Sequence, residues 1–288
     1  MAFYIEEKGV EENNSKRPYK AVVTQVYDKK GDGGVDMLDV AELFRSGENE
    51  LVELEDDGDF RSPECLALLD EADIIVTNPP FSLFREYVSM LVEHQKHFII
   101  IGNQNAISYE ETFSLMKNNK MWIGASIHSG DRAFFVPDDY PLDAAGCGID
   151  EITGRKYIRV KGIRWFTNLD IKQRHEEMIL VRHYTPEQYP KYVNYDAIEV
   201  AKTSDIPCDY DGEMGVPITF MDKYNPEQFE IIGISRELVR TLSEDVRKNG
   251  AYPQIGRFYL DVGAEKYKKV YERLVIRNKR PELPKEEK

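Results

Sequence analysis

The stretch Ile74-Ile75-Val76-Thr77-Asn78-Pro79-Pro80-Phe81 decides the fold, because it joins a short apolar run to a rigid turn. The run Ile74–Val76 is typical of a strand buried in a parallel sheet. Upstream, Ser62 followed by Pro63 is typical of the start of a helix. Downstream, Ser82–Glu93 has the pattern of an amphipathic helix. The stretch therefore predicts a helix–strand–turn–helix unit.

The same alternation extends in both directions along the chain. Strands are predicted at Lys20–Tyr27, Glu50–Leu54, His97–Gly102 and Met121–Gly124, and helices at Val40–Arg45 and Tyr109–Asn118. Strands that alternate with helices at this spacing predict an α/β fold, in which helices cover a parallel sheet.

After about residue 130 the pattern changes. Antiparallel strands are predicted at Ala133–Val136, Tyr157–Val160 and Ile179–Arg182, with a turn at Thr153-Gly154-Arg155 and a Tyr/Pro-rich linker at Tyr184–Tyr195. We therefore expect a flexible leader over residues 1–17, an α/β domain over 18–190 and a smaller α+β region over 191–288.

Composition excludes several classes of protein. Of the 288 residues, 41% are hydrophobic and 31% charged, which is globular. No apolar run is long enough to span a bilayer, and the N-terminus lacks the layout of a signal peptide. The three cysteines, Cys65, Cys147 and Cys208, are widely spaced, and the five histidines show no metal-ligand spacing. These features predict a cytoplasmic protein with no membrane partner and no disulfide framework.

The net charge of −14 argues against coating of nucleic acid by bulk electrostatics, but the charge is uneven. Residues 151–180 hold 7 Lys/Arg against 4 Asp/Glu, and residues 236–280 hold 12 against 6. A polyanion would therefore meet the middle and the end of the chain.

The turn after Val76 has the composition of a binding site for an amine. Two prolines remove two N–H donors, so the turn presents acceptors, namely the Asn78 side-chain oxygen and the carbonyl between Pro79 and Pro80. Two acceptors suit an exocyclic amine, and the ring of Phe81 suits stacking on a flat heterocycle. This combination favours methylation of the amino group of a flipped base. The alternative is an ordinary turn that follows a strand.

Val76–Phe81 and its continuation Ser82–Val88, together with Gly58–Ser62 and Arg164–Asp170, resemble the EcoRI-type adenine-specific DNA methyltransferases of restriction-modification systems. The resemblance runs from about residue 18 nearly to the C-terminus. It implies a Rossmann-like methyltransferase sheet, S-adenosyl-L-methionine as methyl donor, and N6 of adenine in double-stranded DNA as acceptor.

Carried over by position, the resemblance makes Asn78, Pro79, Pro80 and Phe81 the catalytic loop. The same resemblance implies that Asp59 and Phe60 bind the adenine of the cofactor. The alternative for Asp59 is a turn acid among other acids.

One feature of such enzymes is not recognisable, namely a glycine-containing cofactor loop after a first strand. Gly31, Gly33 and Gly34 lie in an acidic turn, and Gly256 and Gly263 lack a strand-loop-helix context. We expect either a missing N-terminal segment, a divergent loop or a protein partner that completes the cofactor site. Two other functions stay open: a truncated or degenerate, non-catalytic module that binds DNA or a partner, and methylation of an amide or amine outside nucleic acid.

Basic residues beside aromatics predict contacts with nucleic acid. Arg155, Lys156 and Arg164 precede Trp165 and Phe166, which predicts phosphate contacts by the cations and a nucleotide contact by the rings. The alternative is core aromatics beside a solvated strand face. A second basic cluster has roughly helical spacing, which predicts either a DNA-tracking or a solvated terminal helix: Lys266, Lys268, Lys269, Arg273, Arg277, Lys279 and Arg280.

An acidic segment resembles a calcium loop of the EF-hand type. Asp28, Asp32, Asp36 and Asp39 fall at loop positions 1, 5, 9 and 12, with glycine at position 6. Lys30 occupies position 3, where a ligand is usual. The sequence thus predicts either calcium binding or a solvated acidic turn.

Overall fold

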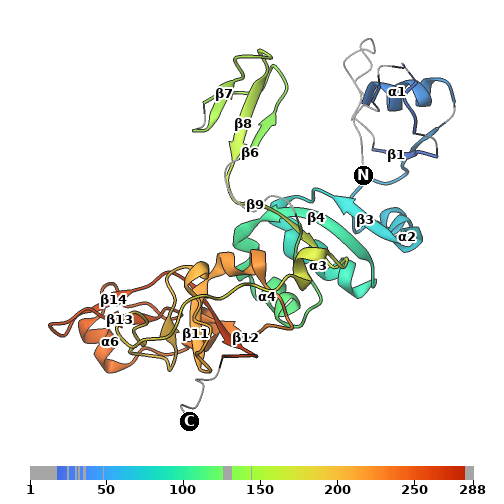
Figure 1. Ribbon diagram of the computed structural model, residues 1–288. Helices are drawn as coiled ribbons and strands as arrows, with labels where there is room; N and C mark the ends of the chain where they lie inside the picture. The colour runs from blue at the N-terminus through green and yellow to red at the C-terminus, as the bar shows by residue number, and fades with distance from the viewer. Residues whose placement is uncertain are drawn as a thin grey trace. The chain divides into compact units, whose positions relative to one another are not determined.

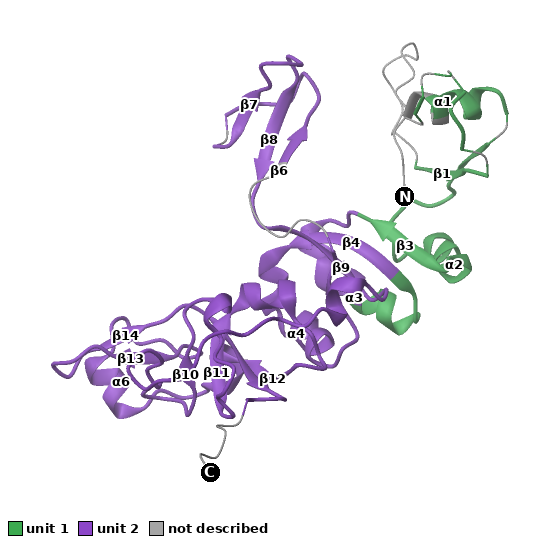
Figure 2. Cartoon of the chain, in the orientation of Figure 1, with its two compact units in different colours: residues 1–77, 89–97 green, residues 78–88, 98–288 purple. Residues whose placement is uncertain are grey.

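The computed structural model of the chain describes residues 18–24, 26–29, 31, 33–34, 37–47, 49–125, 132–143 and 145–282. The predicted leader 1–17 lies outside them. The chain divides into two compact units, one formed by Met1–Thr77 with Ser89–His97 and the other by Asn78–Val88 with Phe98–Lys288 (Figure 2). Among the described helices, none combines the length and apolar composition that crossing a membrane requires.

The first unit contains the predicted elements in order: β1 (Tyr19–Val22), α1 (Met37–Arg45), β2 (Glu50–Glu53), α2 (Pro63–Glu71) and β3 (Ile74–Thr77) (Figure 1). Strands β1 and β2 pair antiparallel, from Tyr19 opposite Glu53 to Val22 opposite Glu50. The predicted cap of α2 is confirmed, because the Ser62 hydroxyl accepts a hydrogen bond from the Cys65 N–H at 3.2 Å.

The prediction that β3 is buried is wrong. Ile74 and Val76 are each 49% exposed, while Ile75 and Thr77 are half-buried. Apolar composition shows what a strand could bury, but the elements packed on it decide what is covered.

The second unit contains a sheet in which β9 (Ile163–Thr167) lies between β4 (His97–Asn103) and β5 (Trp122–Ile123). Both neighbours pair with β9 antiparallel, Ile100 and Ile123 lying opposite Phe166. The fold is α/β as predicted, but these pairings are not those of a purely parallel sheet. The helical segments around this sheet are η1 (Phe81–Leu83), α3 (Phe84–Glu93), η2 (Gln104–Ser108) and α4 (Glu110–Lys117).

A separate antiparallel sheet interrupts the chain between β5 and β9. Its order is β6-β8-β7, with bounds Arg132–Phe135, Lys156–Val160 and Cys147–Ile149. This confirms the antiparallel strands predicted near residues 133–136 and 157–160.

The C-terminal region is mainly β. One sheet has the order β10-β11-β15-β12, with bounds Ile198–Glu199, Glu213–Pro217, Arg273–Asn278 and Phe229–Ile234. A hairpin pairs β13 (Tyr259–Asp261) with β14 (Tyr267–Lys269). The remaining elements are η3 (Lys172–His175), η4 (Thr203–Asp205), η5 (Ile218–Lys223), α5 (Ser235–Leu238) and α6 (Glu244–Asn249).

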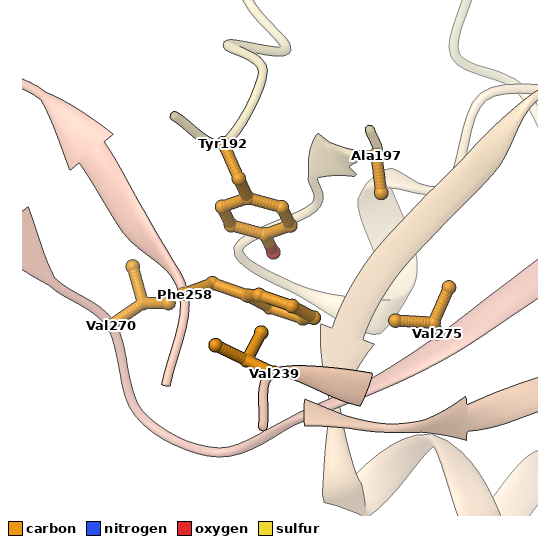
Figure 3. Packing of buried hydrophobic residues seen from close by; sticks show 6 residues of the cluster. All are labelled: Tyr192, Ala197, Val239, Phe258, Val270 and Val275. Carbon is orange, nitrogen blue, oxygen red and sulfur yellow. The ribbon is translucent and has the colours of Figure 1, made fainter. Parts of the chain in front are cut away.

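Three local predictions for this region are wrong. The basic cluster at 266–280 lies on and directly beside β14 and β15 rather than on a helix. Ile179–Arg182 forms no strand, and Arg182 makes only an isolated bridge with Pro207. The Tyr/Pro-rich stretch at 184–195 is packed, because Tyr192 is 5% exposed and stacks on Phe258 with ring centroids 4.4 Å apart (Figure 3).

Candidate functional site

The Asn-Pro-Pro-Phe turn connects β3 to η1. Asn78, Pro80 and Phe81 are exposed, and Pro79 is buried. The Pro80 carbonyl accepts a hydrogen bond from the Leu83 N–H at 2.9 Å and so begins the helical turn. Within the described part of the chain, no group bonds to the Asn78 side chain or the Pro79 carbonyl. The two acceptors identified in the sequence are therefore not engaged by any described protein group, and the nearby Phe81 ring is 41% exposed.

Packing of α3 fixes the end of this turn. Phe84, the first residue of α3, is 2% exposed and meets the ring of Phe166 edge to face, with centroids 5.1 Å apart. Gly102 on β4 allows this approach, because a Cβ at that position would lie 2.4 Å from the Phe84 ring. The turn is thus anchored by an aromatic contact three residues further along the chain.

Asp59 and Phe60, the residues predicted to meet the cofactor, lie in the first unit before α2. The Asp59 carboxylate accepts three hydrogen bonds from Arg61, from its Nε at 2.8 Å, its Nη2 at 2.7 Å and its backbone N–H at 2.9 Å. These bonds lower the pKa of Asp59 to about 2, and the side-chain bonds contribute more than the backbone bond. The Arg61 guanidinium also lies 5.2 Å from the centre of the Phe60 ring.

The backbone before Asp59 needs a glycine. Gly58 has φ of +74°, and a Cβ there would lie 2.8 Å from the Pro18 side chain. The lowered pKa keeps the carboxylate of Asp59 ionised, and Gly58 permits the tight turn that holds this residue. Since a carboxylate offers about four acceptor positions, the three bonds from Arg61 leave capacity for one more donor.

Two residues predicted to contact nucleic acid lie in the interior instead. Arg164 is 3% exposed and forms an ion pair with Asp222, with Nε 3.2 Å from Oδ1. Phe166 is fully buried against Phe84. Both lie on β9, an interior strand of its sheet, and their burial assigns them to the core. Trp165, on the opposite face of the same strand, is half-buried.

The other predicted cations lie on the separate β6-β8-β7 sheet. The Arg155 guanidinium lies 4.1 Å from the centre of the exposed Phe135 ring. Lys156 donates to the carbonyls of Asp138 and Tyr140, the latter at 3.0 Å. Arg155 therefore combines a positive charge with an exposed aromatic surface.

The predicted calcium ligands receive no support. Asp32 and Asp36 lie outside the described residues. Both oxygens of Asp28 accept backbone hydrogen bonds, from Gly31 at 2.6 Å and Gly33 at 2.7 Å, and Asp39 is fully buried. In the described part of the segment, Asp28 thus bonds to the backbone of its own turn, and Asp39 is a buried residue of α1.

The C-terminal basic cluster divides into paired and unpaired cations. Arg273 forms a buried ion pair with Glu199, while Arg277 pairs with Glu213 and Arg280 with Glu177. Lys266 and Lys268 are exposed and have no ion-pair partner among the described residues. Lys268 also lines a cavity of about 620 Å³, together with Arg182, Tyr189, Lys269, Tyr271 and Arg273. Tyr271 is 88% exposed, so an exposed cation and an exposed ring both line this cavity, together with the carboxylates of Glu199 and Asp205.

Sequence reasoning missed one cluster because its members are far apart in the chain. His183, Cys208 and Asp209 place one potential metal-ligand atom each within 4.8 Å of the others. No local spacing marks this cluster, which an isolated bridge between Arg182 and Pro207 brings together.

These features define an α/β protein that presents two hydrogen-bond acceptors and a ring in a turn between a strand and a helix. A family model described as "Adenine-specific methyltransferase EcoRI" matches residues 2–279, and the chain belongs to this family.

The chain is also similar to individual curated proteins. It is 46% identical to the type II methyltransferase M.EcoRI of Escherichia coli over 226 residues, which cover 78% of this chain and 63% of that protein. It is 38% identical to the type II methyltransferase M.MpnI of Mycoplasma pneumoniae over 225 residues, 77% of this chain and 69% of that protein. The match thus spans less than two thirds of M.EcoRI. No solved structure matches the chain.

Proposed function

We propose that the chain transfers a methyl group from S-adenosyl-L-methionine to the exocyclic N6 of adenine in double-stranded DNA. The Asn-Pro-Pro-Phe turn is the observation that carries this proposal. Among the described residues, no group bonds to the Asn78 side chain or the Pro79 carbonyl, and the neighbouring Phe81 ring is exposed. Membership of the adenine-specific family and similarity to two type II methyltransferases support it.

The proposed chemistry uses the turn to orient a nucleophile. The adenine amine donates hydrogen bonds from its two hydrogens to Asn78 Oδ1 and to the Pro79 carbonyl oxygen. These bonds reduce the conjugation of the nitrogen lone pair with the ring and direct the lone pair at the methyl group. The cofactor, when bound, supplies that methyl group on a sulfonium. A nitrogen–carbon bond forms as the sulfur–carbon bond breaks, and the amine then releases a proton to water. No strong base is required.

The acceptor adenine has to leave the duplex to reach this turn. Flipping costs a few kcal/mol of lost stacking and pairing, which contacts with the extruded base offset. Phe81 is the side chain that we assign to this task, because its ring is exposed beside the two acceptors.

We assign the adenine end of the cofactor to Asp59 and Phe60. The carboxylate of Asp59 is ionised and retains one acceptor position for an amine, and Phe60 offers a half-buried ring. These residues fit the adenine end only. We propose that a further segment or a protein partner binds the methionine end of the cofactor. For the fold, we propose a Rossmann-like sheet.

DNA contacts are proposed for Arg155, Lys156 and Trp165, and for the region 191–288. Exposed cations set affinity through phosphate contacts, and exposed rings add stacking. Among the residues that line the C-terminal cavity, Lys268 is an exposed cation and Tyr271 has an exposed ring.

Transfer of radiolabelled methyl groups from S-adenosyl-L-methionine to unmodified bacterial genomic DNA tests the function, because such DNA contains every short target sequence. Label should appear as N6-methyladenine. Asn78→Ala should lower the rate about 100-fold or more, the usual cost of losing an oriented hydrogen bond to the reacting group. Asn118→Ala, which changes another exposed asparagine of the same unit, should retain the rate.

Two results would contradict the proposal. One is equal transfer by the parent and Asn78→Ala. The other is DNA binding by the folded parent without saturable binding of S-adenosyl-L-methionine and without label in DNA, which would identify a non-catalytic binding module. Label on protein rather than DNA would reject adenine as the acceptor.

A further inference from the structure

Three side chains with different donor atoms converge in the C-terminal part of the second unit. His183 Nδ1 lies 3.0 Å from Asp209 Oδ2 and 3.6 Å from Cys208 Sγ. All three donor atoms lie within 4.8 Å of one another. A nitrogen, a sulfur and an oxygen at such separations are a donor set that zinc accepts.

The backbone holds these residues independently of one another's side chains. Arg182 and Pro207 form a parallel bridge, and the Cys208 N–H donates to the Arg182 carbonyl at 2.8 Å. The Cys208 carbonyl accepts from the Glu282 N–H at 2.8 Å. The segments that carry the three donors are therefore joined by main-chain bonds that a bound ion would not disturb.

A backbone hydrogen bond orients the Asp209 carboxylate. Asp209 Oδ1 accepts the Tyr184 N–H at 2.7 Å, so Oδ2 is the oxygen directed at His183. Metal sites commonly fix a ligand carboxylate in this way, with one oxygen bound to the protein and the other to the ion.

The charge around the thiol favours a cation. Cys208 is 3% exposed, and its sulfur lies within 4.8 Å of the Asp209 carboxylate. A divalent cation between a thiol and a carboxylate stabilises the thiolate.

We propose that His183 Nδ1, Cys208 Sγ and Asp209 Oδ2 bind a zinc ion, with the fourth position open to solvent, since the His183 side chain is 71% exposed. Zinc ligands lie about 2.0–2.3 Å from the ion, so tetrahedral neighbours are roughly 3.3–3.8 Å apart. The separation of 3.6 Å between Cys208 Sγ and His183 Nδ1 falls in this range, and the 3.0 Å between His183 Nδ1 and Asp209 Oδ2 needs to increase only slightly.

Binding replaces one hydrogen bond by bonds to the ion. The Cys208 thiol loses its proton to solvent, and His183 carries its remaining proton on Nε2 so that Nδ1 offers a lone pair. No group is oxidised or reduced. Calcium and magnesium prefer oxygen ligands throughout, so the thiol disfavours both.

The ion would join two segments that are distant in the chain. His183 precedes the packed tyrosine-rich stretch, and Cys208 and Asp209 precede β11. Such a site is structural, and its existence does not depend on methyl transfer.

Cobalt titration of the full chain tests the site. Cobalt(II) is the probe, because a thiolate ligand gives a charge-transfer band in the near ultraviolet and tetrahedral coordination gives strong visible bands. The parent should show both, each should disappear when zinc is added, and one proton should be released for each cysteine bound. Zinc should also raise the thermal midpoint of the parent.

Variants identify the ligands. Cys208→Ser should lose the charge-transfer band, whereas Cys65→Ser and Cys147→Ser, which change the two other free cysteines, should keep it. Because the His183 side chain is 71% exposed, His183→Ala should fold normally and should weaken cobalt binding at least tenfold. A parent without the band, or a band retained in Cys208→Ser and lost in another cysteine variant, would overturn the proposal.

Discussion

Phe84 and Phe166 pack edge to face, with ring centroids 5.1 Å apart and an interplanar angle of 61°. Phe84 begins α3, three residues after Phe81, and Phe166 lies on β9 between β4 and β5. Both rings are buried. A strand some eighty residues further along the chain therefore anchors the end of the Asn-Pro-Pro-Phe turn.

Phe166→Ala should destabilise the chain by about 3–5 kcal/mol, because it removes a fully buried ring and leaves a cavity beside Phe84. Phe134→Ala is the matched control, since that ring is 39% exposed and should cost on the order of 0.5 kcal/mol. Urea unfolding measures both. Equal losses would show that the contact between Phe84 and Phe166 is not a main part of the core.

Gly102→Ala should cost about 1–3 kcal/mol, because the new Cβ would lie 2.4 Å from the Phe84 ring and force it to move. Gly34→Ala, in open space and without a positive φ, should be neutral or slightly stabilising. Thermal unfolding of the two variants compares them. If Gly102→Ala were as stable as the parent, close packing at this position would be refuted.

Arg164→Met should cost about 2–4 kcal/mol, because it leaves Asp222, only 12% exposed, without its guanidinium partner. A double variant, Arg164→Met with Asp222→Leu, should recover much of this loss, since it removes both charges. Arg277→Met, at a 45% exposed residue, should cost at most about 1 kcal/mol. Denaturant midpoints give the ranking, and a double variant no better than the single one would contradict it.

Asp59 should remain mostly ionised at about pH 3, where an ordinary aspartic acid is mostly protonated. Its pKa is lowered to about 2, first by the side-chain bonds and then by the backbone N–H of Arg61. The stabilisation of the ionised form is therefore complete above the ordinary value of 3.8 and is lost as the pH falls through about 2.

Carboxyl-carbon NMR measures this titration, with the Asp59 signal assigned by its absence in Asp59→Asn. Arg61→Gln should return the midpoint close to the ordinary value. A midpoint near that value in the parent would disprove the pairing of Asp59 with Arg61.

Lys268→Ala should weaken binding to duplex DNA and reduce the slope of log affinity against log salt by about 0.9, the contribution of one neutralised phosphate. Lys268 is exposed and has no ion-pair partner among the described residues. Arg277→Ala is the control, because that charge is already paired with Glu213 and Glu230. Fluorescence anisotropy across a salt series measures both slopes. An unchanged slope in Lys268→Ala would remove this lysine from the DNA contacts.

Local elements were largely predictable from the sequence. The cap at Ser62, the helix that begins near Phe84 and the strand at 97–103 depend on residues close together in the chain, so their patterns carry the necessary information. The absence of two N–H donors from the Asn-Pro-Pro-Phe turn likewise follows from its two prolines. Membership of the family, indicated by the blocks around Val76–Val88, is confirmed.

Burial and pairing were less predictable. Arg164 and Phe166 have the composition of a basic and aromatic surface, yet β9 lies between two strands and its side chains are covered. The cluster at 266–280 has helical spacing of charge, yet it forms β14 and β15, because apolar residues at 274–276 pair with β11 and β12. Charge spacing alone does not show which backbone partners a segment finds.

The sequence by itself therefore determined the family of the chain, its alternation of strands and helices and the residue composition of its Asn-Pro-Pro-Phe turn, because these depend on short-range propensity and on residue type. Only the tertiary structure decided that β9 lies between β4 and β5, that Ile74 and Val76 are exposed, and that His183 meets Cys208. Each of these depends on contacts between residues far apart in the chain, which form when the whole unit buries its apolar surface and satisfies its backbone hydrogen bonds.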